Sequence, residues 1–115
     1  MNNKNLVDWI NKLIAEDRLS DFYTSRPWRK VRAISFEQNN YECQECKRKG
    51  RLTLLAHPGE QPRAGEVKGI GHHKKPLRRY PQLALTVSNV EPVCWSCHNE
   101  IEKKNTENIL TEEIW

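Results

Sequence analysis

Four cysteines, arranged as two Cys-x-x-Cys pairs, constrain this chain more than any other feature. No apolar run follows Met1, which predicts neither a signal peptide nor a transmembrane helix and therefore a reducing compartment, the cytoplasm. In such a compartment two pairs of this spacing are typical of a tetrahedral zinc site rather than of disulfides. We predict that one structural Zn²⁺ is bound by Cys43, Cys46, Cys94 and Cys97.

The size of the chain favours the same interpretation. Its 115 residues fit one domain, with 37% hydrophobic and 30% charged residues, and a core this small often needs a metal or a disulfide for stability. The alternatives are unremarkable buried thiols or a thioredoxin-like redox motif, which would need one reactive pair beside a βαβ pattern. The sequence has two pairs and no such pattern, so we favour structural zinc.

The N-terminal residues have the pattern of an amphipathic helix. Residues 5–18 place apolar side chains on one stripe, with Asn5 as the expected N-cap. This stripe packs on the domain or docks a partner protein, and it consists of Leu6, Ile10, Leu13 and Ile14. We divide the chain into an N-terminal helix (1–19), a main domain (20–105) and a C-terminal tail (106–115) with an amphipathic spacing of its own.

A second helix is expected within residues 20–40. It would start near Ser25, with Pro27 in the first turn, and end at the pair Asn39 and Asn40. Three apolar side chains would face the core: Trp28, Val31 and Ile34.

The rest of the domain has the pattern of short strands followed by a helix. Residues 52–56 form a short apolar run, and residues 57–69 form a loop rich in Gly, Pro and charge in which His57 is expected to be exposed. Two strands are expected within 66–75 and 89–94, followed by a helix within 94–105 that leaves Glu102 in water. The expected fold class is α+β.

Three histidines form the second chemical feature. Adjacent side chains on a strand point to opposite faces, so His72 and His73 are expected to have different roles. A histidine with an ordinary pKa of about 6.5 serves as a neutral base or a metal ligand near pH 7. One of the pair would bind a divalent ion with His98 while the other faces the attacking water of a hydrolysis reaction. Spacing alone does not assign which, and the alternative is a binding module without catalysis.

The net charge of +4 suits a polyanionic partner such as DNA without requiring one. Basic residues gather at 46–51 and 72–79. We expect them to contact mostly phosphates, which holds a strand without specifying its sequence. The expected DNA-binding residues are Lys47, Arg48, Lys49, Arg51, Lys74, Lys75, Arg78 and Arg79.

Residues 71–101, GHHKKPLRRYPQLALTVSNVEPVCWSCHNEI, resemble the HNH endonuclease motif. That motif runs His-His or Asp-His, Pro-Leu, an Asn that begins a second strand, and Cys-x-x-Cys-His-Asn. The upstream stretch FYTSRPWRKVRAISFEQNNYECQEC resembles the lead-in of small phage-type members. The resemblance covers about residues 22–102 and implies a ββα-metal (His-Me finger) fold, here with a pair of zinc knuckles and flanking N-terminal helices.

Position by position, the resemblance implies specific roles. His73 matches the general base, and His72 and His98 match the ligands of the catalytic ion. Asn89 matches the Asn that ties the hairpin loop together through backbone hydrogen bonds and so orients the base. The catalytic ion is expected to be Mg²⁺ or Mn²⁺, with Ni²⁺ or Zn²⁺ as occupants in vitro.

The implied activity is that of a metal-dependent DNA endonuclease or nickase that leaves 5′-phosphate and 3′-hydroxyl ends. A phage or prophage origin is expected, in the host cytoplasm and beside DNA packaging (terminase) proteins. Two features depart from the family pattern: Lys74 replaces a branched apolar residue, and the 57–69 segment is long. The alternative functions are a non-catalytic zinc-ribbon nucleic-acid-binding or packaging-complex module and a protein-docking adaptor.

Overall fold

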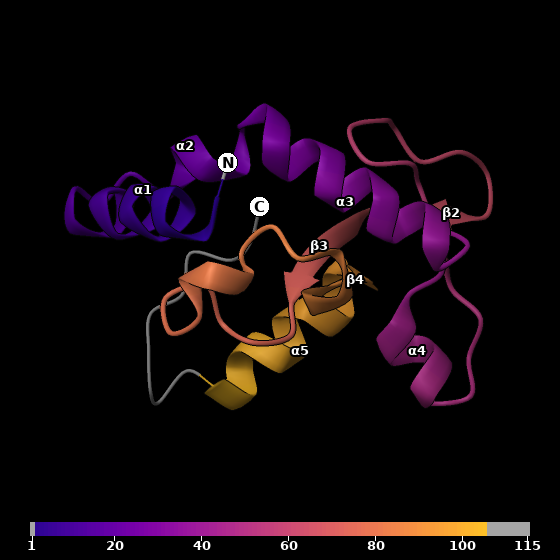
Figure 1. Ribbon diagram of the computed structural model, residues 1–115. Helices are drawn as coiled ribbons and strands as arrows, with labels where there is room; N and C mark the ends of the chain where they lie inside the picture. Colours follow the sequence, from indigo (N-terminus) through magenta and orange to yellow (C-terminus); the bar gives the residue numbers. More distant parts are fainter. Residues whose placement is uncertain (1, 106–115) are drawn as a thin grey trace.

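An antiparallel pair of strands lies between two helices and carries the histidine pair at its end (Figure 1). Strand β3 (Gly69–His73) pairs with β4 (Val90–Cys94) in the register Gly69↔Cys94 to His73↔Val90. Helix α3 (Arg26–Gln38) covers one face of this sheet, and α5 (Trp95–Asn105) covers the other. The predicted strand–connection–strand–helix order is confirmed.

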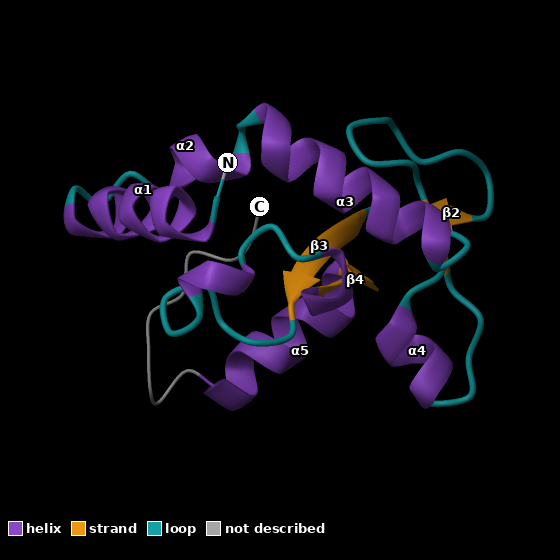
Figure 2. Ribbon diagram, viewed as in Figure 1, coloured by secondary structure: helices purple, strands orange, loops and turns teal. Residues whose placement is uncertain are grey.

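The computed structural model describes residues 2–105, so the predicted tail at 106–115 lies outside the described residues. Before α3 come α1 (Asn3–Ala15) and the short α2 (Leu19–Tyr23), and after it comes α4 (Gln44–Arg48). Strands β1 (Leu54–Leu55) and β2 (Glu66–Val67) form a second, parallel pair (Figure 2). The connection between β3 and β4 contains two 3₁₀ turns, η1 (Pro81–Leu83) and η2 (Val87–Asn89).

Helix α1 begins earlier than the sequence predicts. The side chain of Asn2 accepts a hydrogen bond from the Asn5 backbone N–H at 2.8 Å, so Asn2 is the N-cap and the prediction of Asn5 is wrong. The helix also ends at Ala15 rather than at residue 18, because the backbone turns into the left-handed region at Asp17 (φ 55°). The buried face is the predicted one, with Leu6, Ile10 and Leu13.

Helix α3 has the predicted cap. The Ser25 side chain accepts from the Trp28 backbone N–H at 3.4 Å, and the chain leaves the helix at Asn39. Trp28 is fully buried, as expected. The prediction missed Ser35 and Phe36, which are also fully buried. The Ser35 hydroxyl donates to the Val90 carbonyl at 2.6 Å, which fixes α3 to β4.

The core consists of two clusters. One joins α1, α2 and the start of α3 to the connection between β3 and β4, through residues that include Leu6, Trp28, Leu77 and Ala84. The other surrounds the four cysteines. Helix α1 contributes to the same cluster as the connection between β3 and β4, so the predicted boundary at residue 19 does not separate two hydrophobic cores. The boundary itself stays a prediction.

The 52–69 region differs in detail from its expected pattern. The expected strand at 52–56 is reduced to the two residues of β1, and β2 interrupts the expected loop at 57–69. His57 is exposed, as predicted. None of the helices in residues 2–105 is long and apolar enough to cross a membrane.

Gly71 allows α3 to approach β3 closely. A Cβ at this position would lie 3.1 Å from Arg32 Cγ and 3.1 Å from the ring of Trp28. Trp28 is fully buried, so its ring has little room to move. We expect Gly71→Ala to lower the free energy of unfolding by about 1–3 kcal/mol, measured by urea denaturation. The exposed Ser88→Ala should leave it within about 0.5 kcal/mol, and equal values for the two variants would contradict this packing.

Candidate active site

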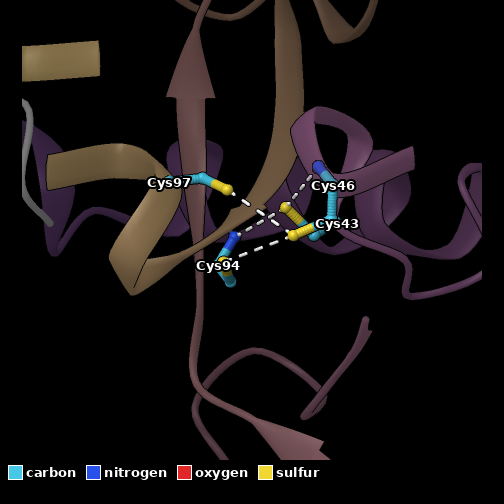
Figure 3. A group of neighbouring side chains, drawn as sticks. All are labelled: Cys43, Cys46, Cys94 and Cys97. Carbon is cyan, nitrogen blue, oxygen red and sulfur yellow. Dashed lines mark hydrogen bonds between the residues drawn. The ribbon is translucent and has the colours of Figure 1, made fainter. Parts of the chain in front are cut away.

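The four cysteines meet at one point, as predicted (Figure 3). Cys43 and Cys46 come from the N-terminal end of α4, whereas Cys94 ends β4 and Cys97 lies in the first turn of α5. The Cys46 sulfur lies 3.5 Å from that of Cys97 and 3.9 Å from that of Cys94. Four thiolates on one tetrahedral zinc ion, with Zn–S bonds of about 2.3 Å, lie about 3.8 Å apart. The spacing therefore fits zinc.

Backbone hydrogen bonds hold the first knuckle in place. Cys43 Sγ accepts from the backbone N–H of Cys46 at 3.4 Å and of Cys94 at 3.2 Å. Burial raises the pKa of the Cys43 thiol and that of Cys97. For Cys46, burial again raises the pKa of the thiol. Hydrogen bonds with Thr53 and the other cysteines outweigh the effect of burial and lower the pKa of Cys46 to about 7. Four buried thiolates need a cation to be stable together, which a structural zinc ion supplies.

A second cluster of metal-binding side chains lies between β3 and α5. His72, His98 and Glu102 offer ligand atoms that all lie within 4.8 Å of one another. His98 is fully buried, and its Nε2 lies 3.7 Å from Glu102 Oε1. The prediction that Glu102 stays in water is wrong: its side chain is 15% exposed. Residues four positions apart on a helix share a face, so the spacing of His98 and Glu102 could have indicated that Glu102 lies beside His98.

His72 has the properties of a neutral ligand. Burial, with a further contribution from His98, lowers the pKa of His72 to about 4. Its Nδ1 is buried and has no hydrogen-bond partner among the described residues. A neutral imidazole beside a carboxylate and a second imidazole is a set that suits Mn²⁺, Mg²⁺ or Zn²⁺. The residues present therefore fit a divalent cation.

His73 points to the opposite face of the strand, against α2 and α3. Its ring stacks on that of Trp28 at a centroid distance of 4.8 Å, and its Nε2 lies 3.0 Å from the Ala84 carbonyl oxygen. A carbonyl only accepts hydrogen bonds, so Nε2 carries the hydrogen and Nδ1 is the basic nitrogen. Burial lowers the pKa of His73, which keeps it neutral at pH 7.

Asn89 links the two ends of the connection between the strands. Its side chain accepts from the Lys75 backbone N–H at 2.9 Å and donates to the carbonyls of Lys75 at 3.2 Å and Leu83 at 3.4 Å. The backbone adds a bond from the Lys74 N–H to the Asn89 carbonyl at 2.8 Å. Because Ala84 follows Leu83, this network also holds the carbonyl that contacts His73.

The predicted DNA-binding residues fall into two groups. Arg48 and Lys49 form ion pairs: Arg48 contacts Glu45 and Glu91 at 2.7 and 2.8 Å, and Lys49 contacts Glu100 at 3.0 Å. Arg48 therefore bridges the first cysteine knuckle to β4, where the buried Glu91 lies opposite His72. We did not predict this bridge from the sequence, because its residues lie 43 positions apart. The other group has exposed side chains, apart from a half-buried Arg78: Lys47, Arg51, Lys74, Lys75, Arg78 and Arg79.

Comparisons with known proteins agree with this arrangement. The sequence model described as HNH endonuclease matches residues 43–104, which is more than half of the chain. The chain therefore belongs to the HNH endonuclease family, and it is a nuclease with the small α+β HNH fold. This favours catalysis over the alternatives of a binding module or an adaptor.

A solved structure with a similar fold is the HNH endonuclease of the deep-sea thermophilic bacteriophage GVE2, crystallised with a manganese ion. The match has a TM-score of 0.66 and 22% sequence identity, and it covers 87% of this chain and 95% of that one. At this identity the match is evidence for a shared fold. No curated protein matches the chain.

Removal of zinc is expected to unfold the domain, because the cysteines lie in one of its two core clusters and metal binding is coupled to folding. Purified protein should contain about one zinc per chain by mass spectrometry or atomic absorption. Cys43→Ser should lose both the zinc and the cooperative thermal transition followed by circular dichroism. A Cys43→Ser protein with wild-type melting would contradict a structural role, and Ser88→Ala serves as the control that keeps both.

Glu102 is expected to contribute to cation binding. Glu102→Gln should weaken the binding of Mn²⁺ to the zinc-loaded protein by about tenfold or more, measured by isothermal titration calorimetry. Glu100→Gln is the matched control: it removes the same charge from an exposed position on the same helix. Equal affinities in both variants would exclude Glu102 as a ligand.

Proposed function

We propose that this HNH endonuclease is a metal-dependent DNA endonuclease or nickase in which His73 activates the attacking water. The observation that carries the proposal is the position of the adjacent histidines. His72 and His73 are the last two residues of β3. His72 lies with His98 and Glu102 in the cation-ligand cluster, whereas His73 contacts the Ala84 carbonyl on the opposite face. Both side chains lie at the same end of the sheet, which is where we expect the scissile phosphate to bind.

His73 would act as a general base. Its Nδ1 takes a proton from water while Nε2–H stays bonded to the Ala84 carbonyl, which stabilises the resulting imidazolium. The water oxygen attacks phosphorus, and the bond from phosphorus to the 3′-oxygen breaks. The products are a 5′-phosphate and a 3′-hydroxyl, once solvent protonates the leaving oxygen. Because His73 is 1% exposed, this reaction requires the surrounding side chains to admit water when DNA binds.

His72, His98 and Glu102 would hold the catalytic cation. When bound, a divalent cation there supplies Lewis-acid chemistry, neutralising charge on the phosphate and on the leaving oxygen. The carboxylate suits Mn²⁺ or Mg²⁺ and the two imidazoles also accept Ni²⁺ or Zn²⁺, so the donor set alone does not select the ion, and we propose Mn²⁺ or Mg²⁺. The manganese ion in the GVE2 enzyme supports this choice.

Asn89 would position the base rather than contact the substrate. Its hydrogen bonds to Lys75 and Leu83 hold the connection that carries the Ala84 carbonyl. The exposed basic residues around the hairpin, such as Lys74, Lys75 and Arg79, would bind phosphates beside the cleaved bond.

We also propose a phage or prophage origin and a role beside the DNA packaging proteins of a phage. The likeness of fold to a bacteriophage HNH endonuclease over 95% of that chain supports this origin. Terminase subunits are expected to copurify with the tagged protein from phage-producing cells, and their absence would contradict a packaging role.

Cleavage of supercoiled plasmid tests the proposed chemistry. Zinc-loaded protein should nick the plasmid with added Mg²⁺ or Mn²⁺ and not without. His73→Ala should lower the rate by about 10²-fold or more, the usual contribution of a general base. His73→Gln fills more of the buried space and should be equally inactive while keeping a cooperative thermal transition. Asn11→Ala, on the exposed side of α1, is the active control. Cleavage that persists in both His73 variants would refute the assigned base.

A further inference from the structure

A pocket of about 440 Å³ lies between α3, the loop after β1 and the start of β3. Its volume is in the range of small-ligand sites and suits a single nucleotide. The polar and aromatic side chains that line it are Tyr23, Arg32, His57, Glu60, Gln61 and Lys68. None of them belongs to the cation-ligand cluster or the zinc site.

The pocket carries two cationic side chains. Arg32 packs beside Gly71 of β3, and its Nε is buried without a hydrogen-bond partner among the described residues. Burial, with a smaller contribution from Arg29, lowers the pKa of Arg32, although a guanidinium stays charged at pH 7. Lys68 is exposed at the start of the strand. With Glu60 as the one carboxylate in the lining, the pocket favours an anion.

The imidazole ring of His57 lies in the lining of the pocket and stacks on a second ring. His57 stacks on Tyr41 with ring centroids 4.0 Å apart and planes at 8°, although His57 itself is exposed. A flat exposed ring held in this way is a platform on which an unpaired base stacks. The cations and this ring together offer contacts to the phosphate and the base of one nucleotide.

The pocket lies close to the proposed catalytic residues. Tyr23, which lines it, has its ring 6.1 Å from that of His73. The strand that runs from Ile70 to His73 spans about 10 Å at about 3.3 Å per residue. At most about three nucleotides of one DNA strand span that distance, because a stacked strand rises about 3.4 Å per nucleotide and an unstacked strand is more extended.

We propose that this pocket binds a nucleotide of a DNA strand separated from its complement, within about three nucleotides of the cleaved bond. The base stacks on His57, and the phosphate lies between Arg32 and Lys68. A base that is still paired and stacked in a duplex cannot enter such a pocket, so the preferred substrate has a single-stranded or frayed region. This inference rests on the proposed function in that it takes DNA as the substrate.

Binding of fluorescent oligonucleotides tests the inference without cleavage. Zinc-loaded protein, with no other divalent cation added, is titrated into a labelled single strand and into the matching duplex, and anisotropy is recorded over a range of salt concentrations. We expect tighter binding of the single strand. His57→Ala should weaken that binding by about tenfold. Lys68→Gln should lower the slope of log affinity against log salt by about 0.7, the loss of one phosphate contact.

The control is Lys30→Gln, which removes a charge from the same helix as Arg32. Lys30 is exposed and lies two residues from Arg32, and hence on nearly the opposite side of the helix. Both pocket residues tested are exposed, so their variants should melt like the wild type. Wild-type affinity in both pocket variants, an equal loss in Lys30→Gln, or equal affinity for single strand and duplex overturns the inference. A protein that binds in the expected way but does not cut plasmid would refute the proposed chemistry and leave the pocket intact.

Discussion

The meeting of four sulfur atoms from two distant segments is the constraint on which the rest of the structure depends. Cys94 ends β4 and Cys97 lies in the first turn of α5, so the site that gathers the cysteines also fixes where the strand stops and the helix begins. His98 follows at once, and Glu102 lies one helical turn further along. A small change in the direction of α5 would therefore move two of the three side chains that suit the catalytic cation.

The sequence predicts the elements that carry strong local patterns. The cap of α3 at Ser25, the buried stripe of α1 and the order of the hairpin and its helix follow from side-chain spacing and capping chemistry. The gathering of the cysteines follows from their spacing, because two thiols with two residues between them can turn toward one ion. The family motif then assigns roles to residues that periodicity alone cannot distinguish, such as His72 and His73.

The rest depends on contacts between residues far apart in the chain. The Ala84 carbonyl that contacts His73 is a backbone atom, so no side-chain pattern marks it. The ion pair of Arg48 with Glu91 joins residues 43 positions apart and appears once α4 packs on β4. The pocket around His57 needs the loop after β1 to lie against α3, and its residues look like ordinary loop residues in the sequence.

The packing of α1 on the η1 turn bears on how long a fragment of this chain must be to fold with its site intact. The family motif matches residues 43–104, yet the turn at 81–84 rests on α1, and the wall beside His73 is the indole of Trp28. A fragment limited to these residues would contain the proposed ligands and the proposed base without the helices that pack around the base. The smallest fragment expected to fold with these side chains in place therefore includes the N-terminal helices.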